Sequence, residues 1–333
     1  MLFVPATRWN MIEKAAASAA DAVCLDLEDS VPPEDKGAAR SNAIRAFREL
    51  DFGHRTRMFR MNALDGPFAY RDLVDIVEAA GDRIDLVMLP KAGSPEDVRF
   101  VAALLAQIEE NCGFGPPVAE LGRAGRASAL PATQEVAPWP SRGHGDFRPI
   151  GIEVQIESSA GFLYVREIAE SSPRIEALIF GPGDYSASLQ MPSASIGEPD
   201  EHDAMYPGHR WHAAMHSIVA AARANGLRCM DGPFAGYRDA EGFERSCRIA
   251  RAMGFDGKQC IHPSQLETAN RVFTPSADEV ERAEEVLRAY DAAVAAGRGA
   301  AGLNGRMIDA ANLRMARVVV EKSRLCRGEG RTA

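Results

Sequence analysis

The sequence lacks the features of a membrane or secreted protein. None of its apolar runs approaches the roughly 18 residues that cross a bilayer, and the N-terminus has no signal-peptide pattern. An excess of basic residues is also missing, since 38 Lys and Arg stand against 47 Asp and Glu and the formal net charge is -9. Nucleic-acid binders normally present a basic face. These absences predict a cytoplasmic protein with no nucleic-acid or membrane partner.

Cysteine and histidine patterns that hold metals or disulfides are absent as well. The six cysteines include no CxxC pair and no framework spacing, which indicates reduced, mostly buried thiols. No HExxH or HxH spacing occurs. His202, His209 and His212 are therefore interpreted as surface or capping residues rather than as a zinc set.

What the chain does contain is a regular alternation of strand-like and helix-like segments. Its composition, with 46% hydrophobic and 26% charged residues, is ordinary for a soluble globular protein. Eight near-continuous runs of Val, Ile, Leu and Met are each followed by a helical segment, which is typical of strands buried on both faces. We therefore predict an α/β protein whose residues 1–273 form a (β/α)8 TIM barrel.

Some segments fall outside that alternation. Residues 113–149 include six prolines and join a helix to a strand, so this proline-rich insert should lie at the N-terminal face as a contact or disordered segment. Residues 186–210 follow a strand and should lie over the open face as a lid. Residues 274–326 form a predicted C-terminal helical module without a barrel strand, and residues 327–333 are a frayed tail.

Charged side chains recur where the predicted strands end. In a parallel barrel all these ends open on one face, and barrel enzymes build their active sites there. The residues at the strand ends are Glu28, Asp29, Arg60, Lys91, Glu157, Asp184, Asp231 and His262. Scattered surface charges would not fall in that register eight times, so the pattern predicts an active site on this face.

Two of these acids, Glu157 and Asp184, end consecutive strands. Neighbouring parallel strands deliver them to the same side, where they make a seat for Mg2+, which prefers oxygen ligands and keeps positions for water or substrate. In the alternative interpretation, Glu157 caps the following helix and Asp184 closes a Gly-Pro-Gly turn. Spacing alone leaves both interpretations open.

Ten short motifs together resemble one known family. In chain order they are LFVPATR, AVCLDLEDSV, FRMNAL, VMLPK, QIESSAG, FGPGDYSASL, DGPF, GFDGKQCIHPSQ, FTPS and GRMID. Their combination resembles the HpcH/HpaI aldolase and citrate lyase superfamily, and within it the CitE-like CoA-ester lyases. FGPGDY, YPGHRWH, ARANGL and DGPFAGYRD are most similar to the malyl-CoA and β-methylmalyl-CoA lyase group. The resemblance covers nearly the whole chain apart from the proline-rich insert and the tail.

The resemblance implies a carbon–carbon lyase that depends on Mg2+, with Mn2+ as a substitute. Such an enzyme reversibly cleaves L-malyl-CoA to glyoxylate and acetyl-CoA, or β-methylmalyl-CoA to glyoxylate and propionyl-CoA. Cleavage leaves an electron pair on the thioester fragment, so an enolate must be stabilised. The alternatives are a citramalyl-CoA lyase releasing pyruvate, a malyl-CoA thioesterase, a CoA-independent HpcH-type 2-keto acid aldolase, and a catalytically silent acyl-CoA-binding subunit.

The same resemblance assigns roles to residues at the strand ends. The positions of Glu157 and Asp184 match the family's metal ligands, and Arg60 matches an arginine against the substrate carboxylate or the developing enolate. Glu28 and Asp29 then orient Arg60 or metal-bound waters. In the alternative interpretation, Arg60 pairs with Glu28 or Asp29 as part of the barrel scaffold.

The turn after the sixth predicted strand is a further candidate. Backbone N–H groups of Gly181, Gly183 and Asp184 are expected to bind the glyoxylate carboxylate, because two glycines permit a concave turn. The alternative is that these glycines only make the turn tight.

Proton transfer and CoA binding are assigned through the resemblance alone. Asp309 of GRMID matches an aspartate that moves the proton, in a C-terminal module closing over a neighbouring subunit of a homo-oligomer, a trimer or hexamer; alternatively Asp309 only caps a helix. Arg8 and Lys14 match positions near the CoA phosphates, and Lys91 is expected nearby. His262 is interpreted as a residue that holds a turn.

Overall fold

The computed structural model of the chain describes residues 1–114, 149–193, 195–204 and 210–328. The predicted proline-rich insert at 113–149 falls almost wholly outside these residues, as do most of the tail at 327–333 and the whole of His209, so their predicted roles stay predictions. Within the described part of the chain, no helix is long and apolar enough to span a bilayer.

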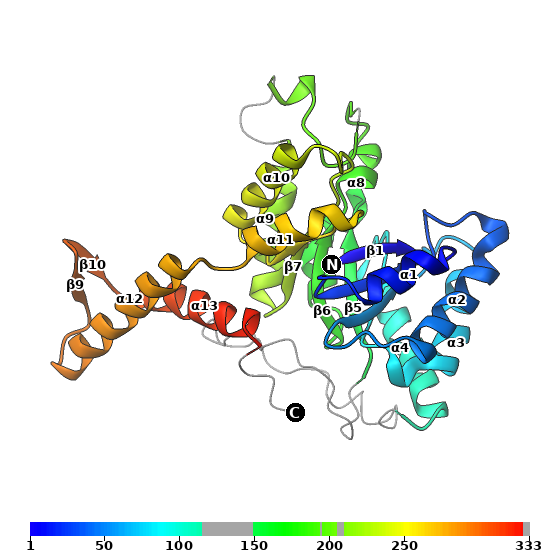
Figure 1. The fold of residues 1–333 in the computed structure, drawn as a ribbon, viewed down its shortest axis with the longest axis horizontal. Coiled ribbons are helices and arrows are strands. Elements are labelled where there is room, and N and C mark those ends of the chain that lie inside the picture. Colours follow the sequence, from blue (N-terminus) through cyan, green and yellow to red (C-terminus); the bar gives the residue numbers. More distant parts are fainter. Residues whose placement is uncertain (115–148, 194, 205–209, 329–333) are drawn as a thin grey trace.

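Eight parallel strands form one curled sheet (Figure 1). Their order along the sheet follows the sequence, as the alternation of segments predicts. The strands are β1 (Leu2–Pro5), β2 (Ala22–Asp26), β3 (Thr56–Arg60), β4 (Leu86–Leu89), β5 (Gly151–Ile156), β6 (Ile175–Phe180), β7 (Arg228–Asp231) and β8 (Gly257–Lys258). A parallel bridge also pairs Leu2 with Cys260, just past β8. The chain is an α/β protein, and its curled parallel sheet is consistent with a TIM-like barrel.

Helices follow the strands and pack against the outside of the sheet (Figure 1). They are α1 (Trp9–Ala16), α2 (Lys36–Glu49), α3 (Ala69–Ala80), α4 (Pro95–Asn111), α6 (Ser159–Leu163), α7 (Val165–Ala169), α8 (Pro182–Ser188), α9 (His212–Ala224), α10 (Ala240–Met253) and α11 (Leu266–Phe273). The described residues also form the short 3-10 helices η1 (Pro33–Asp35), η2 (Gly81–Arg83), η3 (Glu201–Ala204) and η4 (Pro263–Gln265). The turn predicted after the sixth strand is instead the start of α8, because Pro182 is suited to the first helical position.

The two faces of β5 differ in chemistry. Ile152, Val154 and Ile156 belong to the large core between sheet and helices. The alternating positions Glu153 and Gln155 therefore point to the inner side, where a separate cluster of buried apolar residues lies. That inner cluster comprises Met1, Ala22, Cys24, Met58, Leu86, Met88 and Ile179. Continuing the alternation, β5 directs the next residue, Glu157, to the inner side at the C-terminal end of the sheet.

A buried ion pair joins the end of α4 to the starts of β5 and β6. Arg174 Nη2 lies 2.6 Å from Glu109 Oε2, and the two side chains are 6% and 0% exposed. Glu109 also accepts the N–H of Ile150 at 2.7 Å, and Arg174 donates to the O of Ile150 at 3.0 Å. Each charge is therefore satisfied by the other and by backbone, as a buried pair requires.

Removing one partner of this pair should destabilise the protein strongly. We expect Arg174→Met to lower the free energy of unfolding by about 3–5 kcal/mol, because Glu109 is left buried without a counter-charge. Urea denaturation followed by circular dichroism measures the change. The double variant Arg174→Met/Glu109→Leu should regain much of the loss, since no uncompensated charge remains. A loss of only about 1 kcal/mol in Arg174→Met would show that the pair behaves like a surface ion pair.

The C-terminal module consists of α12 (Ala277–Ala295), β9 (Ala301–Leu303), β10 (Arg306–Ile308) and α13 (Ala310–Cys326). The glycine-rich segment between its two helices forms an antiparallel hairpin of β9 and β10, which the prediction of a purely helical module did not include. Ala283, Ala316 and Val320 form a small core between the two helices. The module projects from the sheet at the left of Figure 1. Its predicted closure over an active site stays a prediction.

Candidate active site

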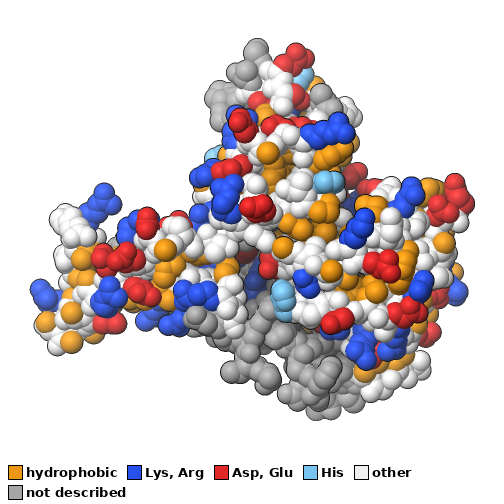
Figure 2. Space-filling view, viewed as in Figure 1, with side chains coloured by type: hydrophobic (Ala, Val, Ile, Leu, Met, Phe, Trp, Pro, Cys, Tyr) orange, Lys and Arg blue, Asp and Glu red, His pale blue; other side chains and the backbone are white. Residues whose placement is uncertain are grey.

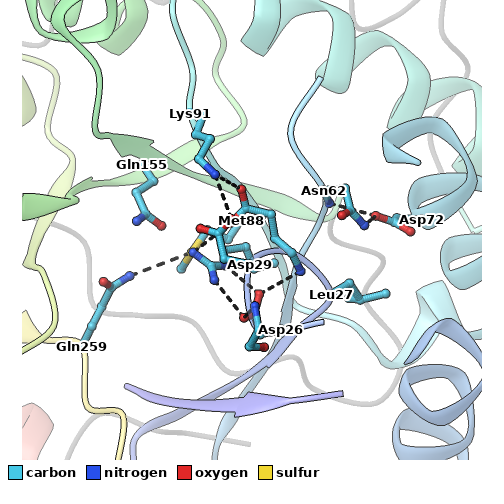
Figure 3. Close-up of polar contacts among 12 residues, drawn as sticks. Asp26, Leu27, Asp29, Asn62, Asp72, Met88, Lys91, Gln155 and Gln259 are labelled. Atoms are coloured by element: carbon cyan, nitrogen blue, oxygen red, sulfur yellow. Dashed lines mark hydrogen bonds and ion pairs between the residues drawn. The ribbon is translucent and has the colours of Figure 1, made fainter. Parts of the chain in front are cut away.

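Charged residues from five consecutive strands meet at the C-terminal edge of the sheet, and Figure 3 shows Asp26, Asp29 and Lys91 among them. Asp26 ends β2 and is followed by Glu28 and Asp29, Arg60 ends β3, Lys91 follows β4, Glu157 follows β5, and Asp184 lies in the first turn of α8 after β6. The structure therefore brings together most of the strand-end charges that the sequence singles out. Asp231 is different, because it is buried in an ion pair with Lys258 of β8.

Arg60 is held in place by two carboxylates. Its Nε and Nη2 donate to the two oxygens of Asp26 at 2.7 and 2.8 Å, and Nη1 lies 3.1 Å from Glu28 Oε2. Burial by itself raises the pKa of Asp26, but the Arg60 guanidinium outweighs it and holds that pKa below its usual value. The predicted pairing of Arg60 with Glu28 is observed, and Asp26 makes a further, bidentate contact that was not predicted. The cross-strand register, which pairs Asp26 with Arg60, is the signal that the sequence analysis missed.

A lysine lies among the acids. Lys91 Nζ is 2.5 Å from Glu28, 2.9 Å from Asp29 and 4.0 Å from Asp184. Burial lowers the pKa of Lys91, but the bonds to Glu28 and Asp29 outweigh it and raise that pKa above its usual value. Figure 3 shows the Lys91 side chain reaching toward these acids. The predicted contact of Lys91 with CoA stays a prediction, since its ammonium group binds carboxylates here.

Glu157 is buried and receives two hydrogen bonds. Gln155 Nε2 donates to its Oε2 at 2.6 Å, and the backbone N–H of Lys91 donates to its Oε1 at 2.8 Å. Burial is the main reason that the pKa of Glu157 rises to about 8; Arg60 opposes the rise, and Asp184 and Glu28 add to it. The helix-cap interpretation of Glu157 is wrong, because Ser158 Oγ accepts the N–H of Gly161 at the start of α6.

Gln155 and Lys36 are supporting residues that the sequence analysis missed. Gln155 is buried, and its Oε1 has no hydrogen-bond partner among the described residues. Its place in β5, two residues before Glu157, was the available signal. Lys36 is also buried, and its Nζ donates to the O of Leu27 at 2.7 Å and of Glu28 at 2.8 Å, which fixes the loop after β2.

The glycine after β6 makes room for Glu157. A Cβ on Gly181 would lie 2.5 Å from Oε2 of Glu157 and 3.0 Å from Nε2 of Gln155. The N–H of Gly181 donates to the O of Ile156 at 3.0 Å, so this group is already used within the sheet and the predicted contact with glyoxylate needs correction. Gly181 matters because it has no side chain, which leaves room for Glu157 and Gln155. For Gly183 the predicted donor role stays a prediction.

The acid cluster is chemically suited to a divalent cation. Carboxylate oxygens come from four residues, Glu157, Asp184, Glu28 and Asp29. The Lys91 ammonium is a positive charge that lies among them. Burial is the main cause of the raised pKa of Glu157, and the nearby carboxylates of Asp184 and Glu28 add to it. No three acidic, histidine or cysteine side chains of the described residues converge to hold a metal by themselves. The arrangement therefore fits an ion held by two carboxylates that takes further oxygens from water or substrate.

The remaining candidates lie outside this cluster. Asp309 caps α13, where its Oδ1 accepts the N–H groups of Ala311 and Asn312 at 2.9 and 3.2 Å. Arg8 and Lys14 are exposed, just before and within α1. The helix-cap interpretation of Asp309 is thus observed, and it leaves the catalytic role open because one carboxylate can serve both.

Comparison with known proteins relates this site to a family. Residues 1–263 match the model of the HpcH/HpaI aldolase/citrate lyase family. The chain is 42% identical over 330 residues, 97% of its length and 94% of the relative's, to the L-malyl-CoA/beta-methylmalyl-CoA lyase of Cereibacter sphaeroides. It is 31% identical, covering 93% of this chain and 82% of the relative, to the malyl-CoA/beta-methylmalyl-CoA/citramalyl-CoA lyase of Chloroflexus aurantiacus.

A solved structure is similar over nearly the whole chain. CitE from Mycobacterium tuberculosis, in complex with magnesium, acetoacetate and coenzyme A, superposes with a TM-score of 0.70. It is 27% identical and covers 97% of this chain and 96% of its own.

Proposed function

Because the chain belongs to the HpcH/HpaI aldolase/citrate lyase family, we propose that it is a lyase of L-malyl-CoA and β-methylmalyl-CoA. The reaction breaks one carbon–carbon bond and gives glyoxylate with acetyl-CoA or propionyl-CoA, and it is reversible. Full-length similarity to lyases of these substrates is the observation that carries the proposal. A closed (β/α)8 barrel, with Leu2 and Cys260 at its seam, is the scaffold that we infer for it.

Glu157 and Asp184 are the proposed ligands of Mg2+, for which Mn2+ can substitute because both prefer oxygen donors. When bound, the ion supplies Lewis-acid polarisation and a template for the oxygens of the substrate. Gln155 and the backbone N–H of Lys91 hold the Glu157 carboxylate by its two oxygens. Such supporting bonds fix a ligand's orientation and help to set metal affinity.

A substitution at Gly181 tests this arrangement. We expect Gly181→Ala to weaken Mg2+ binding about 10- to 100-fold, because the new methyl group displaces Glu157 and Gln155. Isothermal titration calorimetry with Mg2+ measures the effect. Gly37→Ala is the matched control, since a Cβ on Gly37 of α2 meets nothing within 4 Å. Equal Mg2+ affinities in both variants would show that Gly181 does not position the ligand.

Arg60 is the proposed stabiliser of the enolate or of the substrate carboxylate. Asp26 holds its guanidinium by two parallel hydrogen bonds, so the positive charge is oriented before the substrate arrives. Pre-oriented charge of this kind favours a transition state in which negative charge develops on oxygen. Glu28 and Asp29 complete the surroundings by binding Arg60 and Lys91.

The proton is proposed to pass through Asp309 of a neighbouring subunit. At its C-terminal end, α13 contacts its own barrel, where Lys322 Nζ donates to the O of Asp256 just before β8. Asp309 caps the other end of this helix, 13 residues before Lys322 and therefore about 20 Å away at 1.5 Å per residue. Asp256 lies just before β8, at the edge of the sheet opposite the acid cluster, and the module projects from the sheet (Figure 1), which supports a role of Asp309 in the site of another subunit.

Exposed apolar side chains on the module support a homo-oligomer, a trimer or hexamer. Met307, Met315 and Val318 are 73%, 60% and 63% exposed. Large apolar side chains exposed together are typical of surfaces that another protein covers. A second copy of this chain, with its strand-end face against the module, accounts for both the apolar surface and the distant Asp309. Arg8 and Lys14 remain the proposed contacts of the CoA phosphates.

One assay separates the candidate activities. The protein is incubated with Mg2+ and, in turn, with malyl-CoA, β-methylmalyl-CoA and citramalyl-CoA, and glyoxylate, pyruvate and free CoA are measured. We expect glyoxylate from the first two. Pyruvate from citramalyl-CoA would add the activity that names the Chloroflexus aurantiacus relative. Free CoA without glyoxylate identifies a thioesterase, and turnover of free keto acids alone would overturn the CoA assignment.

A further inference from the structure

Two histidines lie side by side on the exposed face of α9, away from the acid cluster. His212 and His216 are four residues apart, a spacing that places two side chains on the same face of a helix in adjacent turns. Their ring centroids are 4.5 Å apart, with an interplanar angle of 51°. Both residues are exposed. Figure 2 shows histidine side chains (pale blue) at separate places on this face of the molecule, including the region of α9 and α10.

Neither imidazole has a polar partner among the residues that the structure describes. No hydrogen bond or ion pair joins either ring to another of these residues. The other face of α9, with Met215 and Ile218, packs into the large core and anchors the helix. Within the described part of the chain, the ring nitrogens of the two histidines are therefore available to a ligand.

The spacing of the two rings suits a single transition-metal ion. Neutral imidazole is a ligand for Zn2+, Cu2+ and Ni2+. With metal–nitrogen bonds of about 2.1 Å, two imidazoles in adjacent coordination positions have ring centres about 4.5–5 Å apart. The observed separation of 4.5 Å lies in that range. No third acidic, histidine or cysteine side chain of the described residues joins the pair, so water would complete the coordination of an ion bound there.

The pair differs from the acid cluster in the metal that it selects. α9 contains no acidic residue, so the helix offers only nitrogen ligands, whereas Mg2+ requires oxygen. The rings also lie in the first two turns of α9, where the helix dipole disfavours a cation. An ion must therefore be held by its bonds to nitrogen rather than by charge attraction. Such bonds favour Cu2+ above all, and Ni2+ and Zn2+ over Mg2+.

We propose that His212 and His216 form a second metal site, which binds Cu2+, Ni2+ or Zn2+ and does not bind Mg2+. One ion joins the first two turns of α9 through one nitrogen of each ring, and water fills its other positions. The site does not depend on the proposed function, because it shares no residue with the acid cluster.

Calorimetric titration of the untagged protein with Ni2+, in the presence of excess Mg2+, tests this site. We expect the wild type and Glu157→Gln to bind Ni2+ with the same Kd, because the acid cluster takes no part. His212→Ala and His216→Ala should each raise that Kd at least about 10- to 100-fold, since losing a ligand costs no less than losing a residue that supports one. His202→Ala is the matched control, because this side chain is 44% exposed and lies outside α9.

A shifted pair tests whether the spacing of the histidines matters. His212→Ala/Ala220→His moves the pair one turn along α9, because Ala220 is exposed and lies four residues after His216. This double variant should regain a Kd for Ni2+ close to that of the wild type. A Kd no lower than that of His212→Ala would overturn the site. Absence of Ni2+ binding by the wild type, or an unchanged Kd in both single alanine variants, would overturn it as well.

Discussion

Replacing Glu157 with glutamine is expected to abolish lyase activity while the fold persists. The change removes one of the two carboxylates proposed to hold Mg2+. The chemistry supplied by such an ion contributes several kcal/mol, so kcat/KM should fall about a thousandfold or more. The new side chain has the same shape, and its amide can donate to Oε1 of Gln155, which has no hydrogen-bond partner among the residues that the structure describes. Calorimetric titration should show Mg2+ affinity falling together with activity.

The free energy of unfolding of Glu157→Gln should stay the same or rise, although its lyase activity falls. The pKa of Glu157 is raised from 4.5 to about 8, mainly by burial, so the fold disfavours the ionised carboxylate. The wild type without metal therefore loses stability as the pH rises from about 4.5 to about 8, and the neutral glutamine removes this loss. Urea denaturation at several pH values should show a flatter pH dependence for Glu157→Gln and at least wild-type stability at neutral pH.

The control for both measurements is an exposed glutamate. Glu96 on α4 is 71% exposed, and Glu96→Gln should leave activity, Mg2+ affinity and the pH dependence unchanged. If Glu157→Gln binds Mg2+ as tightly as the wild type, or turns over at a similar rate, then Glu157 is not a metal ligand.

Asp309→Asn is the second change with a large expected effect. We expect kcat to fall about 100- to 10,000-fold, the usual contribution of a positioned acid or base, with Mg2+ affinity unchanged. The helix cap should survive, because the amide oxygen of asparagine can accept the N–H groups of Ala311 and Asn312. An unchanged Tm with lost turnover separates the catalytic role from capping. Asp278→Asn at the start of α12 is the control within the same module.

Mixing two inactive variants tests whether Asp309 acts across subunits. Glu157→Gln and Asp309→Asn are unfolded and refolded together, or expressed together, so that they form mixed oligomers. If each site combines the barrel of one subunit with Asp309 of the next, about a quarter of the sites in a random mixture contain both intact residues, and activity returns. If Asp309 serves its own barrel, no site contains both and activity stays absent. The second result would overturn the shared site.

The order of strands and the location of the site could be predicted from sequence because both depend on local patterns. Near-continuous apolar runs mark strands buried on both faces, and parallel strands necessarily end on the same face. Charges that immediately follow such runs, as Glu157 and Lys91 do, are therefore brought together without knowledge of their side-chain directions. The start of α4 also follows from a local signal, because Ser94 stands directly before Pro95.

The contacts within the site could not be predicted, because they depend on register and backbone conformation. The pairing of Asp26 with Arg60 requires the cross-strand register, which no local pattern gives. The bond from Gln155 to Glu157 requires knowing that both point to the inner side of β5. The hairpin of β9 and β10 was missed because glycine-rich segments serve equally well as links and as tight turns.

The backbone of Lys91 has a consequence for how such sites can diversify. Lys91 has a φ of 50°, a conformation that residues other than glycine rarely adopt, and in it the backbone N–H donates to Glu157 while the side chain binds Glu28 and Asp29. Glycine adopts this conformation readily, so it would preserve the bond to Glu157 and delete only the positive charge. The side chain of Lys91 therefore sets the positive charge of the site, whereas its backbone holds the Glu157 carboxylate in place. A substitution of Lys91 can therefore change which anions bind at this edge of the sheet without moving the Glu157 carboxylate.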